Sequence, residues 1–461
     1  APVITDTPSD ITITEGESYN LNDISVSDNS GIYTITKTIN NTSTLKHGTY
    51  LVGYKVTDEA GNTTNITRNL KVQMATDTSG ASTPNISSGM IPVVYDYGKE
   101  AFVKADTSNW YNYNNKEWAN IVLVSDTVRD KYNSALEGTQ ILESDVLAYY
   151  VWIPRYRYQI FYDEVNATSK QLINIKFESK ETSKSLGTAK TEWLTHPAFT
   201  FGSDELDGIW VGKFELTGDT TTPTIKPNVT SLRNLNVSTF FTTSRKLNYG
   251  TIRDTSMIKN IEWGAASYLT TSIYGQGLTE VRINNSSTYI TGCAANMENG
   301  GAYSGCENAY NTTTGVLAST TGNISGIYDM SGGAWEYVMG VVEDSLSSNI
   351  PSGGYTSRYT SGFTGKNLND GTMTTGITFP ENKYYDIYKY GTSSTDYTRY
   401  HLGDATTETK GWNGDNTYFA NVIPWFVRGG DSNNSINAGV LAFMSSNGGG
   451  DNNISTRVVL R

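Results

Sequence analysis

The sequence predicts a β-rich chain that has many short strands, few helices and at least two domains. Its 461 residues exceed the roughly 150 residues of an ordinary domain. Charged residues make up 17% of the chain, below the roughly 25% of typical soluble domains. Glycine (44) and tyrosine (31) are frequent instead. We therefore expect strands and loops whose amide and hydroxyl side chains replace charge as the source of solubility.

Charge argues against nucleic-acid binding, and hydropathy argues against a membrane-spanning helix. A formal net charge of −12 would repel a nucleic-acid backbone. The sequence contains no run of 18 apolar residues, so we expect no membrane-spanning helix. The chain opens at Ala1-Pro2 without a start methionine or a leader, which predicts a processed product or a trimmed fragment.

The first segment, residues 1–73, alternates apolar and polar residues in short runs. These runs are Ile11–Thr14, Tyr33–Thr36 and Tyr50–Val56. Alternation with turn-forming stretches between the runs predicts a small antiparallel β-sandwich.

Residues 54–62 and 68–72 resemble the end of a bacterial immunoglobulin-like surface repeat, in which an Asp-x-x-Gly-Asn turn joins the last two strands. The resemblance covers about 70 residues and implies a spacer domain. Asp58 and Asn62 could bind calcium, or they could simply form the turn.

Residues 74–88 lack a periodic apolar pattern, and their composition predicts a linker. No comparable linker follows, so residues 89–461 are expected to form one large domain. Within it, the apolar pattern predicts a strand at Gly208–Glu215 and a helix at Ser256–Tyr274.

One segment of this large domain carries a specific motif, Asn323–Tyr337. It resembles the N-x-x-G-L-Y-D-M-x-G-N-x-W-E-W signature of the formylglycine-generating, or sulfatase-modifying-factor, superfamily. Further landmarks of that family follow in its order, at 211–217, 260–268, 426–430 and 455–460. The resemblance implies a β-rich α+β chain in which a C-type-lectin-like domain follows an immunoglobulin-like β-sandwich. Residues 89–209, with Trp152–Tyr158, resemble an elaboration found in bacterial surface and phage members.

The same resemblance implies a calcium site near the signature. Asp329 and Glu336 are the candidate ligands, with backbone carbonyls completing the shell. Gly333 stands where the family has an asparagine, which removes one side-chain oxygen. A purely structural turn is the alternative. No other cofactor is expected.

The two cysteines, Cys293 and Cys306, lie in a Gly/Asn-rich segment with twelve residues between them. In an exported protein they could form a disulfide worth about 2–4 kcal/mol. Two free buried thiols are the alternative, and a zinc site lacks further ligands at suitable spacing.

Enzymatic activity is not expected. The oxidase members of the superfamily use a cysteine pair near the C-terminal strands, and no cysteine follows Cys306. An iron site needs clustered histidines, whereas this chain has three scattered ones, His47, His196 and His401. The acidic pairs Asp204/Glu205 and Glu143/Asp145 predict a solvated surface rather than a glycosidase dyad.

The C-terminal stretch, residues 430–461, combines apolar strands with loops of small polar residues. Such loops suit adaptable recognition, and the pattern resembles the variable region of retroelement-diversified proteins. Trp412, Tyr418 and Trp425 could frame the site, although a core role is equally expected for Trp425. The predicted ligand-binding residues are Asp431, Ser432, Asn433, Asn434, Ser435, Asn437, Ser445, Ser446, Asn447, Asp451, Asn452 and Asn453. The alternative is that an asparagine-rich composition pervades the whole chain without special meaning here.

Three functional hypotheses follow. The first is a non-enzymatic protein displayed on a bacterial surface or virion that binds a cell-surface protein or glycan through its C-terminal loops. The second is a structural subunit that self-assembles into a filament, surface layer or phage particle. The third is an enzyme of the superfamily with altered chemistry.

Overall fold

The computed structural model describes most of the chain. The described residues are 1–6, 8–39, 45–160, 170–187, 192–251, 253–343, 361–366, 373–374, 376–389, 402–406, 408–418 and 424–461. They divide into two compact units. Unit 1 comprises Ala1–Asp77, Val93–Asn112 and Ser134–Leu142, and unit 2 comprises Thr78–Pro92, Tyr113–Asn133 and Glu143–Arg461.

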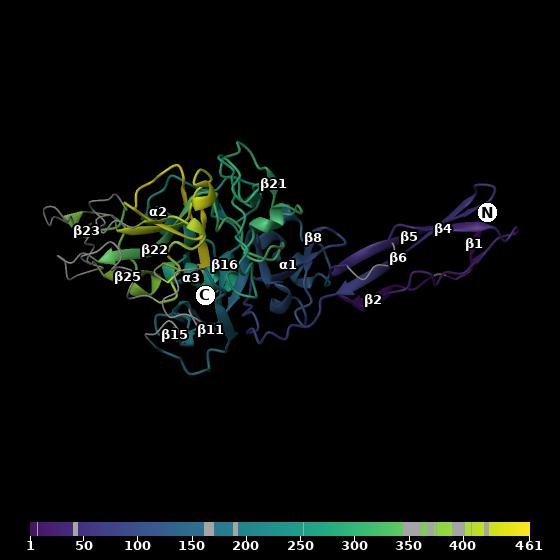
Figure 1. The fold of residues 1–461 in the computed structure, drawn as a ribbon, viewed down its shortest axis with the longest axis horizontal. Coiled ribbons are helices and arrows are strands. Elements are labelled where there is room, and N and C mark those ends of the chain that lie inside the picture. The colour runs from purple at the N-terminus through teal and green to yellow at the C-terminus, as the bar shows by residue number, and fades with distance from the viewer. Residues whose placement is uncertain are drawn as a thin grey trace. The chain divides into compact units, whose positions relative to one another are not determined.

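Unit 1 contains a four-stranded sheet in the order β2-β6-β5-β4. The strands of unit 1 as a whole are β1 (Val3–Ile4), β2 (Ile11–Thr14), β3 (Val26–Ser27), β4 (Tyr33–Lys37), β5 (Gly48–Asp58), β6 (Thr63–Gln73), β7 (Ile91–Asp96) and β8 (Ala101–Lys104). Figure 1 shows β5 and β6 as the long antiparallel pair of this sheet.

Alternating burial along β5 and β6 explains why these residues form strands. Val52, Tyr54, Leu70 and Val72 point to one side and pack with Leu21 as the core of the sheet, while the residues between them face solvent. The turn after β5 is held by Asp58, whose carboxylate accepts hydrogen bonds from the backbone N–H and the side-chain amide of Asn62, both at 2.8 Å. Asp58 and Asn62 therefore serve the turn.

Unit 2 contains two larger antiparallel and mixed sheets. Its first strands and helices are η1 (Tyr113–Asn115), β9 (Asn120–Val124), α1 (Asp126–Ser134), η2 (Glu143–Asp145), β10 (Val146–Pro154), β11 (Tyr156–Gln159), β12 (Asn174–Phe177), β13 (Leu194–Thr195), η3 (Pro197–Phe199), β14 (Thr200–Phe201), β15 (Asp204–Glu205), β16 (Gly208–Gly212), β17 (Thr217–Gly218), β18 (Pro223–Thr224), α2 (Val237–Ser244), β19 (Thr255–Met257) and α3 (Asn260–Thr270).

The remaining elements of unit 2 include most of the predicted C-terminal strands. They are β20 (Cys293–Ala294), β21 (Asn308–Ala309), η4 (Gly315–Ala318), β22 (Trp335–Glu343), β23 (Gly365–Lys366), β24 (Met373–Thr374), η5 (Asn382–Tyr384), β25 (Asp386–Lys389), η7 (Trp412–Gly414), β26 (Thr417–Tyr418), β27 (Trp425–Gly429), η8 (Ser435–Asn437), β28 (Gly439–Ser446), β29 (Ile454–Thr456) and β30 (Val458–Leu460).

One sheet of unit 2 includes the succession β19-β30-β16-β10-β9, and the other follows the order β25-β22-β27-β28-β26, with β29 paired to β22. β29 and β30 are separated by Arg457 alone, so the chain passes from one sheet to the other at this residue. Every residue of β16 is buried, and so are all but one of β10. Such strands are covered on both faces.

The predicted helix at Ser256–Tyr274 was too long at both ends. Helix α3 covers only Asn260–Thr270, and its first N–H groups are supported by Glu262, whose carboxylate accepts from the Lys259 N–H at 2.8 Å. Ser256 and Met257 instead pair with Val459 and Val458 in the sheet. Their backbone groups are used by β30 and are not available to a helix.

Residues 78–88 hold the greater part of the predicted linker and lie in unit 2. The Ser82 hydroxyl donates to the Asp207 carbonyl at 2.5 Å, and the Asn85 carbonyl accepts from the Trp210 indole at 3.0 Å. The predicted domain boundaries themselves stay a prediction. The helices of the described residues are all too short to cross a bilayer, since the longest, α3, has 11 residues.

Candidate functional site

The first predicted loop, Asp431–Asn437, joins β27 to β28. Asn433 and Asn437 are exposed, while Asp431 and Ser432 are buried. Asn434 has a structural role, because its Oδ1 accepts the Asp431 N–H at 2.7 Å. Ser435 is half-buried and adopts a positive φ of 52°.

The second predicted loop, Met444–Ser455, is shorter than expected. β28 continues through Ser446, so Ser445 and Ser446 are strand residues, opposite Phe426 and Trp425 of β27. At the other end, Ser455 is a buried residue of β29. Main-chain pairing with β27 and β22 therefore reduces the loop to residues 447–453.

Main-chain hydrogen bonds hold this second loop against residues 232–237. The Val237 N–H donates to the Gly448 carbonyl at 3.1 Å, and the Asn234 N–H donates to the Asp451 carbonyl at 2.9 Å. Arg233 donates to the Asn452 carbonyl. The loop is thus fixed through its backbone, while the side chains of Asn447, Asp451 and Asn452 are exposed.

Asp431 joins the two loops. Its Oδ1 accepts from the Asn433 N–H at 3.0 Å, and its Oδ2 accepts from the Asn453 side-chain amide at 2.7 Å. Both of its oxygens are therefore used inside the protein. We call the exposed residues that the loops present the C-terminal loop surface: Asn433, Asn437, Asn447, Asp451 and Asn452.

Two further residues belong to this surface and were not predicted from the sequence. The Arg233 guanidinium carbon lies 4.2 Å from the centre of the Tyr289 ring, a cation–π contact. Burial raises the pKa of the Tyr289 phenol, and the negative charges of Asp431 and Asp451 add to the shift. Arg233 also donates to the Asn452 carbonyl, so this residue joins Tyr289 to the second loop. An aromatic residue within an Asn/Ser/Thr run, Asn284–Thr291, was the only sequence signal for it.

The segment that carries Tyr289 is clamped by Asp329. The Asp329 carboxylate accepts from the Asn284 side-chain amide at 2.8 Å and from the Gly292 N–H at 2.9 Å. The Asn284 amide also donates to the Ile290 carbonyl at 2.8 Å. Asp329, one of the two predicted calcium ligands, thus fixes both ends of the Tyr289 segment.

Gly332 and Gly333 connect this segment to the first loop. The Gly333 N–H donates to the Asn284 carbonyl at 2.8 Å, and the Gly333 carbonyl accepts from the Ser432 N–H at 2.9 Å. Both glycines have positive φ, and a Cβ at Gly333 would lie 2.5 Å from Glu215 Oε1. A side chain at Gly333 would be strained by the positive φ and would displace the Glu215 carboxylate, so glycine is favoured here.

Glu336, the other predicted calcium ligand, pairs with Arg457. Both side chains are fully buried, with Arg457 Nη2 2.5 Å from Glu336 Oε1 and Nε 3.0 Å from Oε2. Burial raises the pKa of Glu336 to about 7, and Arg457 opposes this rise. Within the ranges that the structure describes, no three acidic, histidine or cysteine side chains lie close enough to hold a metal ion.

The aromatic residues expected to frame the site differ in exposure. Trp425 is fully buried and Trp412 is 2% exposed, so both are core residues. Tyr418 is 61% exposed and lies in β26, opposite Met444 of β28. Of the three, only Tyr418 is accessible to a ligand.

The histidines and cysteines occupy separate structural positions. His196 is fully buried, donates from Nε2 to the Gly403 carbonyl at 2.8 Å and accepts the Ala198 N–H at Nδ1, and burial lowers its pKa to about 3. His401 lies outside the described residues. Cys293 and Cys306 form a disulfide with an S–S distance of 2.04 Å, which leaves neither as a free thiol.

One member of each acidic pair named in the sequence, Glu205 or Asp145, has ion-pair and hydrogen-bond partners of its own. Glu205 Oε2 lies 2.7 Å from Arg155, whereas Asp204 is exposed. Asp145 accepts hydrogen bonds from Lys131 at 3.1 Å and from the Tyr132 hydroxyl at 2.5 Å. These carboxylates take part in local ion pairs and hydrogen bonds.

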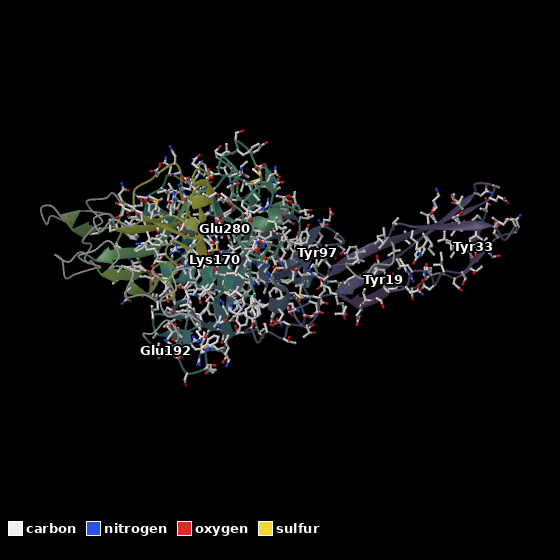
Figure 2. All side chains as sticks on the ribbon, in the orientation of Figure 1. Tyr19, Tyr33, Tyr97, Lys170, Glu192 and Glu280 are labelled. Atoms are coloured by element: carbon white, nitrogen blue, oxygen red, sulfur yellow. A yellow bond between two sulfur atoms is a disulfide. The ribbon has the colours of Figure 1, made fainter. Side chains whose placement is uncertain are left out.

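A second cluster of titratable groups surrounds Asp415 in unit 2. The Asp415 Oδ2 accepts the Leu441 N–H at 3.1 Å, and Oδ1 has no partner among the described residues. Burial raises the pKa of Asp415 to about 8 and that of Glu280 to about 7. Lys170 interacts electrostatically with both (Lys170 and Glu280 are labelled in Figure 2).

Unit 1 contains a cleft of about 390 Å³. It is lined by strand residues of β5 and β6 and by the β7–β8 hairpin. Its polar groups mostly bond one another: Asp96 Oδ1 accepts the Thr49 N–H at 2.8 Å, and the Asn109 amide donates to the Met74 carbonyl at 2.6 Å. Tyr97 (labelled in Figure 2) packs edge-on against His47 nearby. We assign these contacts to packing within unit 1.

Comparison with known proteins identifies the first segment. Residues 5–72 match the family described as "Bacterial surface protein, Ig-like domain". This confirms the predicted immunoglobulin-like domain and indicates a surface or extracellular protein. No curated protein is significantly similar to the chain.

Two solved structures of Clostridium perfringens ZmpB also match. One contains CBM51-2 in complex with GlcNAc and INT domains, with 14% identity, a TM-score of 0.14, and coverage of 35% of this chain and 34% of that chain. The other contains the M60 catalytic domain with CBM51-1 and CBM51-2, with 14% identity, a TM-score of 0.13, and coverage of 35% and 16%. The match thus spans about a third or less of either structure, and TM-scores this low support no inference about fold or ligand.

Proposed function

We propose that this protein is a non-enzymatic, surface-displayed ligand-binding protein, of the adhesin or phage receptor-binding type. Its binding site is the C-terminal loop surface. The observation that carries the proposal is that the backbone and the side chains of the loops have different roles. Their backbones are fixed by hydrogen bonds to residues 232–237 and to Gly333, whereas Asn433, Asn437 and Asn452 have exposed side chains that bond to no other described residue.

The separation between a fixed backbone and exposed side chains also supports diversification by a retroelement. A loop whose shape depends on main-chain hydrogen bonds tolerates many side chains at its outward positions, because surface substitutions away from such bonds usually change stability by less than about 0.5 kcal/mol. Asn433 and Asn452 are positions of this kind. Asp431 and Asn434 belong to the fixed part, since their side chains bond to the loops themselves.

A lectin-like, sulfatase-modifying-factor fold for residues 89–461 is part of the proposal. Its support is that family landmarks distant in sequence contact one another. Lys213 Nζ donates to the Gly326 carbonyl at 2.8 Å, and the Glu215 carboxylate accepts the Ala334 N–H at 2.8 Å. Arg457 pairs with Glu336. Two separate landmarks, 211–217 and 455–460, thus meet around the Asn323–Tyr337 segment, as parts of a single fold would.

Binding of the labelled full chain to a panel of bacterial and host cells, measured by flow cytometry, tests the function. A triple variant, Asn433→Ala, Asn437→Ala and Asn452→Ala, should lose binding to every cell type that the wild type binds, with a Tm within about 2 °C of wild type. A matched control replaces three exposed asparagines outside the surface, Asn65, Asn311 and Asn382, and should bind normally.

Two results would contradict the proposal. The first is a triple variant that binds as the wild type does. The second is a wild-type protein that binds no cell and instead assembles into an ordered polymer under the electron microscope, which would favour the structural-subunit function.

A further inference from the structure

Tyr289 is the aromatic residue of the C-terminal loop surface, and its backbone is held by several hydrogen bonds. It adopts a φ of +59°, which costs a residue other than glycine about 1–3 kcal/mol. Its N–H donates to the Ser286 carbonyl and its carbonyl accepts the Ser231 N–H, both at 2.9 Å. Together with the Asp329 clamp, these bonds hold the strained backbone in place. Strain that the surroundings enforce in this way is typical of binding sites.

A cation lies over the ring, and Tyr289 as a whole is only half-buried. Arg233 lies 4.2 Å from the ring centre of Tyr289. The Tyr289 hydroxyl makes no hydrogen bond with the residues that the structure describes. The ring is therefore a pre-organised, amphipathic contact that loses little conformational freedom on binding.

Planar polar side chains lie on the two loops of the same surface. Asp451 and Asn452 lie in the second loop and Asn433 in the first, and all three side chains are exposed. An amide offers a donor and an acceptor side by side, and a carboxylate offers two acceptors. Hydroxyl groups on adjacent carbons of a sugar are both donors and acceptors at a similar spacing, so they match these side chains.

We propose that the ligand of the C-terminal loop surface is a neutral glycan, with one sugar ring packed against Tyr289 and its hydroxyls bonded to Asp451, Asn433 and Asn452. This inference rests on the proposed function and names its ligand class. A sugar has an apolar C–H face and polar edges, and Tyr289 offers an apolar ring beside polar side chains.

Two observations favour a neutral glycan over a protein or an acidic glycan. A protein interface needs an apolar core within roughly 800 Å² per partner. Among the residues that the structure describes, the exposed apolar side chains of this region are single ones, such as Ile436 (55%) and Val229 (40%). At this surface the two carboxylates of Asp431 and Asp451 outnumber the single guanidinium of Arg233. In a chain of net charge −12, this balance disfavours sialylated or sulfated glycans.

Selective destruction of the cell-surface ligand tests the inference. Mild periodate cleaves adjacent hydroxyl-bearing carbons of sugars, and protease removes proteins. On the cells that the wild type binds, treatment with periodate should reduce binding at least tenfold. Treatment of the same cells with protease should leave measurable binding. Binding lost to protease and unaffected by periodate would overturn the glycan inference. If the asparagine variants still lost binding in that case, the proposed function would stand.

An array of neutral and sialylated oligosaccharides, probed with variants at Tyr289, gives the second test. Tyr289→Leu removes the aromatic ring and should weaken binding to the neutral glycans at least tenfold. Tyr289→Phe is the matched control, because it keeps the ring under the same backbone strain, and it should stay within about threefold of wild type. Equal binding by the leucine variant, or stronger binding to sialylated glycans, would overturn the inference.

Discussion

Arg233 lies over the ring of Tyr289, with 4.2 Å between the guanidinium carbon and the ring centre. The same guanidinium donates to the Asn452 carbonyl. One side chain thus joins the Tyr289 segment to the second C-terminal loop, although the three residues are far apart in the sequence. This contact, with the Asp329 clamp and the Gly332–Gly333 turn, gives the C-terminal loop surface its fixed shape.

Replacement of Gly333 by alanine should destabilise the protein and loosen this surface. The added Cβ would lie 2.5 Å from Glu215 Oε1, on a residue with a φ of +72°. We expect a loss of about 1–3 kcal/mol in the free energy of unfolding, measured by urea denaturation. Gly301→Ala is the control, because nothing lies within 4 Å of its Cβ position, and it should change stability little. Equal effects of the two substitutions would show that the approach to Glu215 is unimportant.

Removal of Arg457 should be the most damaging of the substitutions considered. Arg457→Met leaves the carboxylate of Glu336 buried without its partner and removes donors to the Gly212 and Tyr328 carbonyls, both at 2.8 Å. A loss of about 3–5 kcal/mol is expected. Lys383→Met breaks the ion pair between Lys383, which is 30% exposed, and Glu381, which is 74% exposed. This substitution should lower the free energy of unfolding by less than about 1 kcal/mol. A small effect of Arg457→Met would contradict the role of this residue at the junction of the sheets.

Calcium should not change the thermal stability of the protein. Asp329 accepts hydrogen bonds from Asn284 and Gly292, and Glu336 is paired with Arg457. Protein groups thus occupy the oxygens that the ion would need. Differential scanning calorimetry in EDTA and in millimolar calcium should give the same Tm within about 1 °C. A calcium-dependent rise that Glu336→Gln abolishes would instead establish the calcium site that the family resemblance implies.

Asp415 should make stability depend on pH. Its pKa in the folded protein is raised to about 8 by burial, so the folded state holds this proton more tightly than the unfolded chain. The resulting stabilisation is complete below the unfolded pKa of about 4 and is lost as the pH rises through 8. The free energy of unfolding of the wild type should therefore fall relative to that of Asp415→Asn as the pH rises from 4 to 9. Asp204→Asn, at an exposed position, should show no such change relative to the wild type; parallel curves for all three proteins would refute the shift.

The sequence predicted a small β-sandwich at residues 1–73 because its alternation of apolar residues is local. The resemblance of residues 54–62 and 68–72 to a bacterial surface repeat supplied the immunoglobulin-like assignment. The sequence also singled out Asp329 and Glu336, but their partners, Asn284 and Arg457, are 45 and 121 residues away. No spacing rule connects such residues. Their use in a clamp and an ion pair could only be found in the structure.

The predicted ends of helices and loops were wrong where pairing with a strand distant in sequence determined the local conformation. Ser256 and Met257 follow a helical pattern but pair with β30, and Ser445 and Ser446 have loop-like side chains but pair with β27. Tyr289 was missed because its segment has the same Asn/Ser/Thr composition as much of the chain. Composition located the two loops, whereas their fixed neighbours depend on tertiary contacts.

Hydrogen–deuterium exchange of the full chain, free and bound to cell-surface ligand released from a binding cell type, tests the central claim most directly. The account predicts that ligand protects peptides covering residues 431–437, 447–453 and Tyr289. Peptides of the immunoglobulin-like domain, residues 5–72, should exchange as in the free protein. Protection confined to that domain, or elsewhere in unit 2 with the two loops unchanged, would contradict the claim that the C-terminal loop surface binds the ligand.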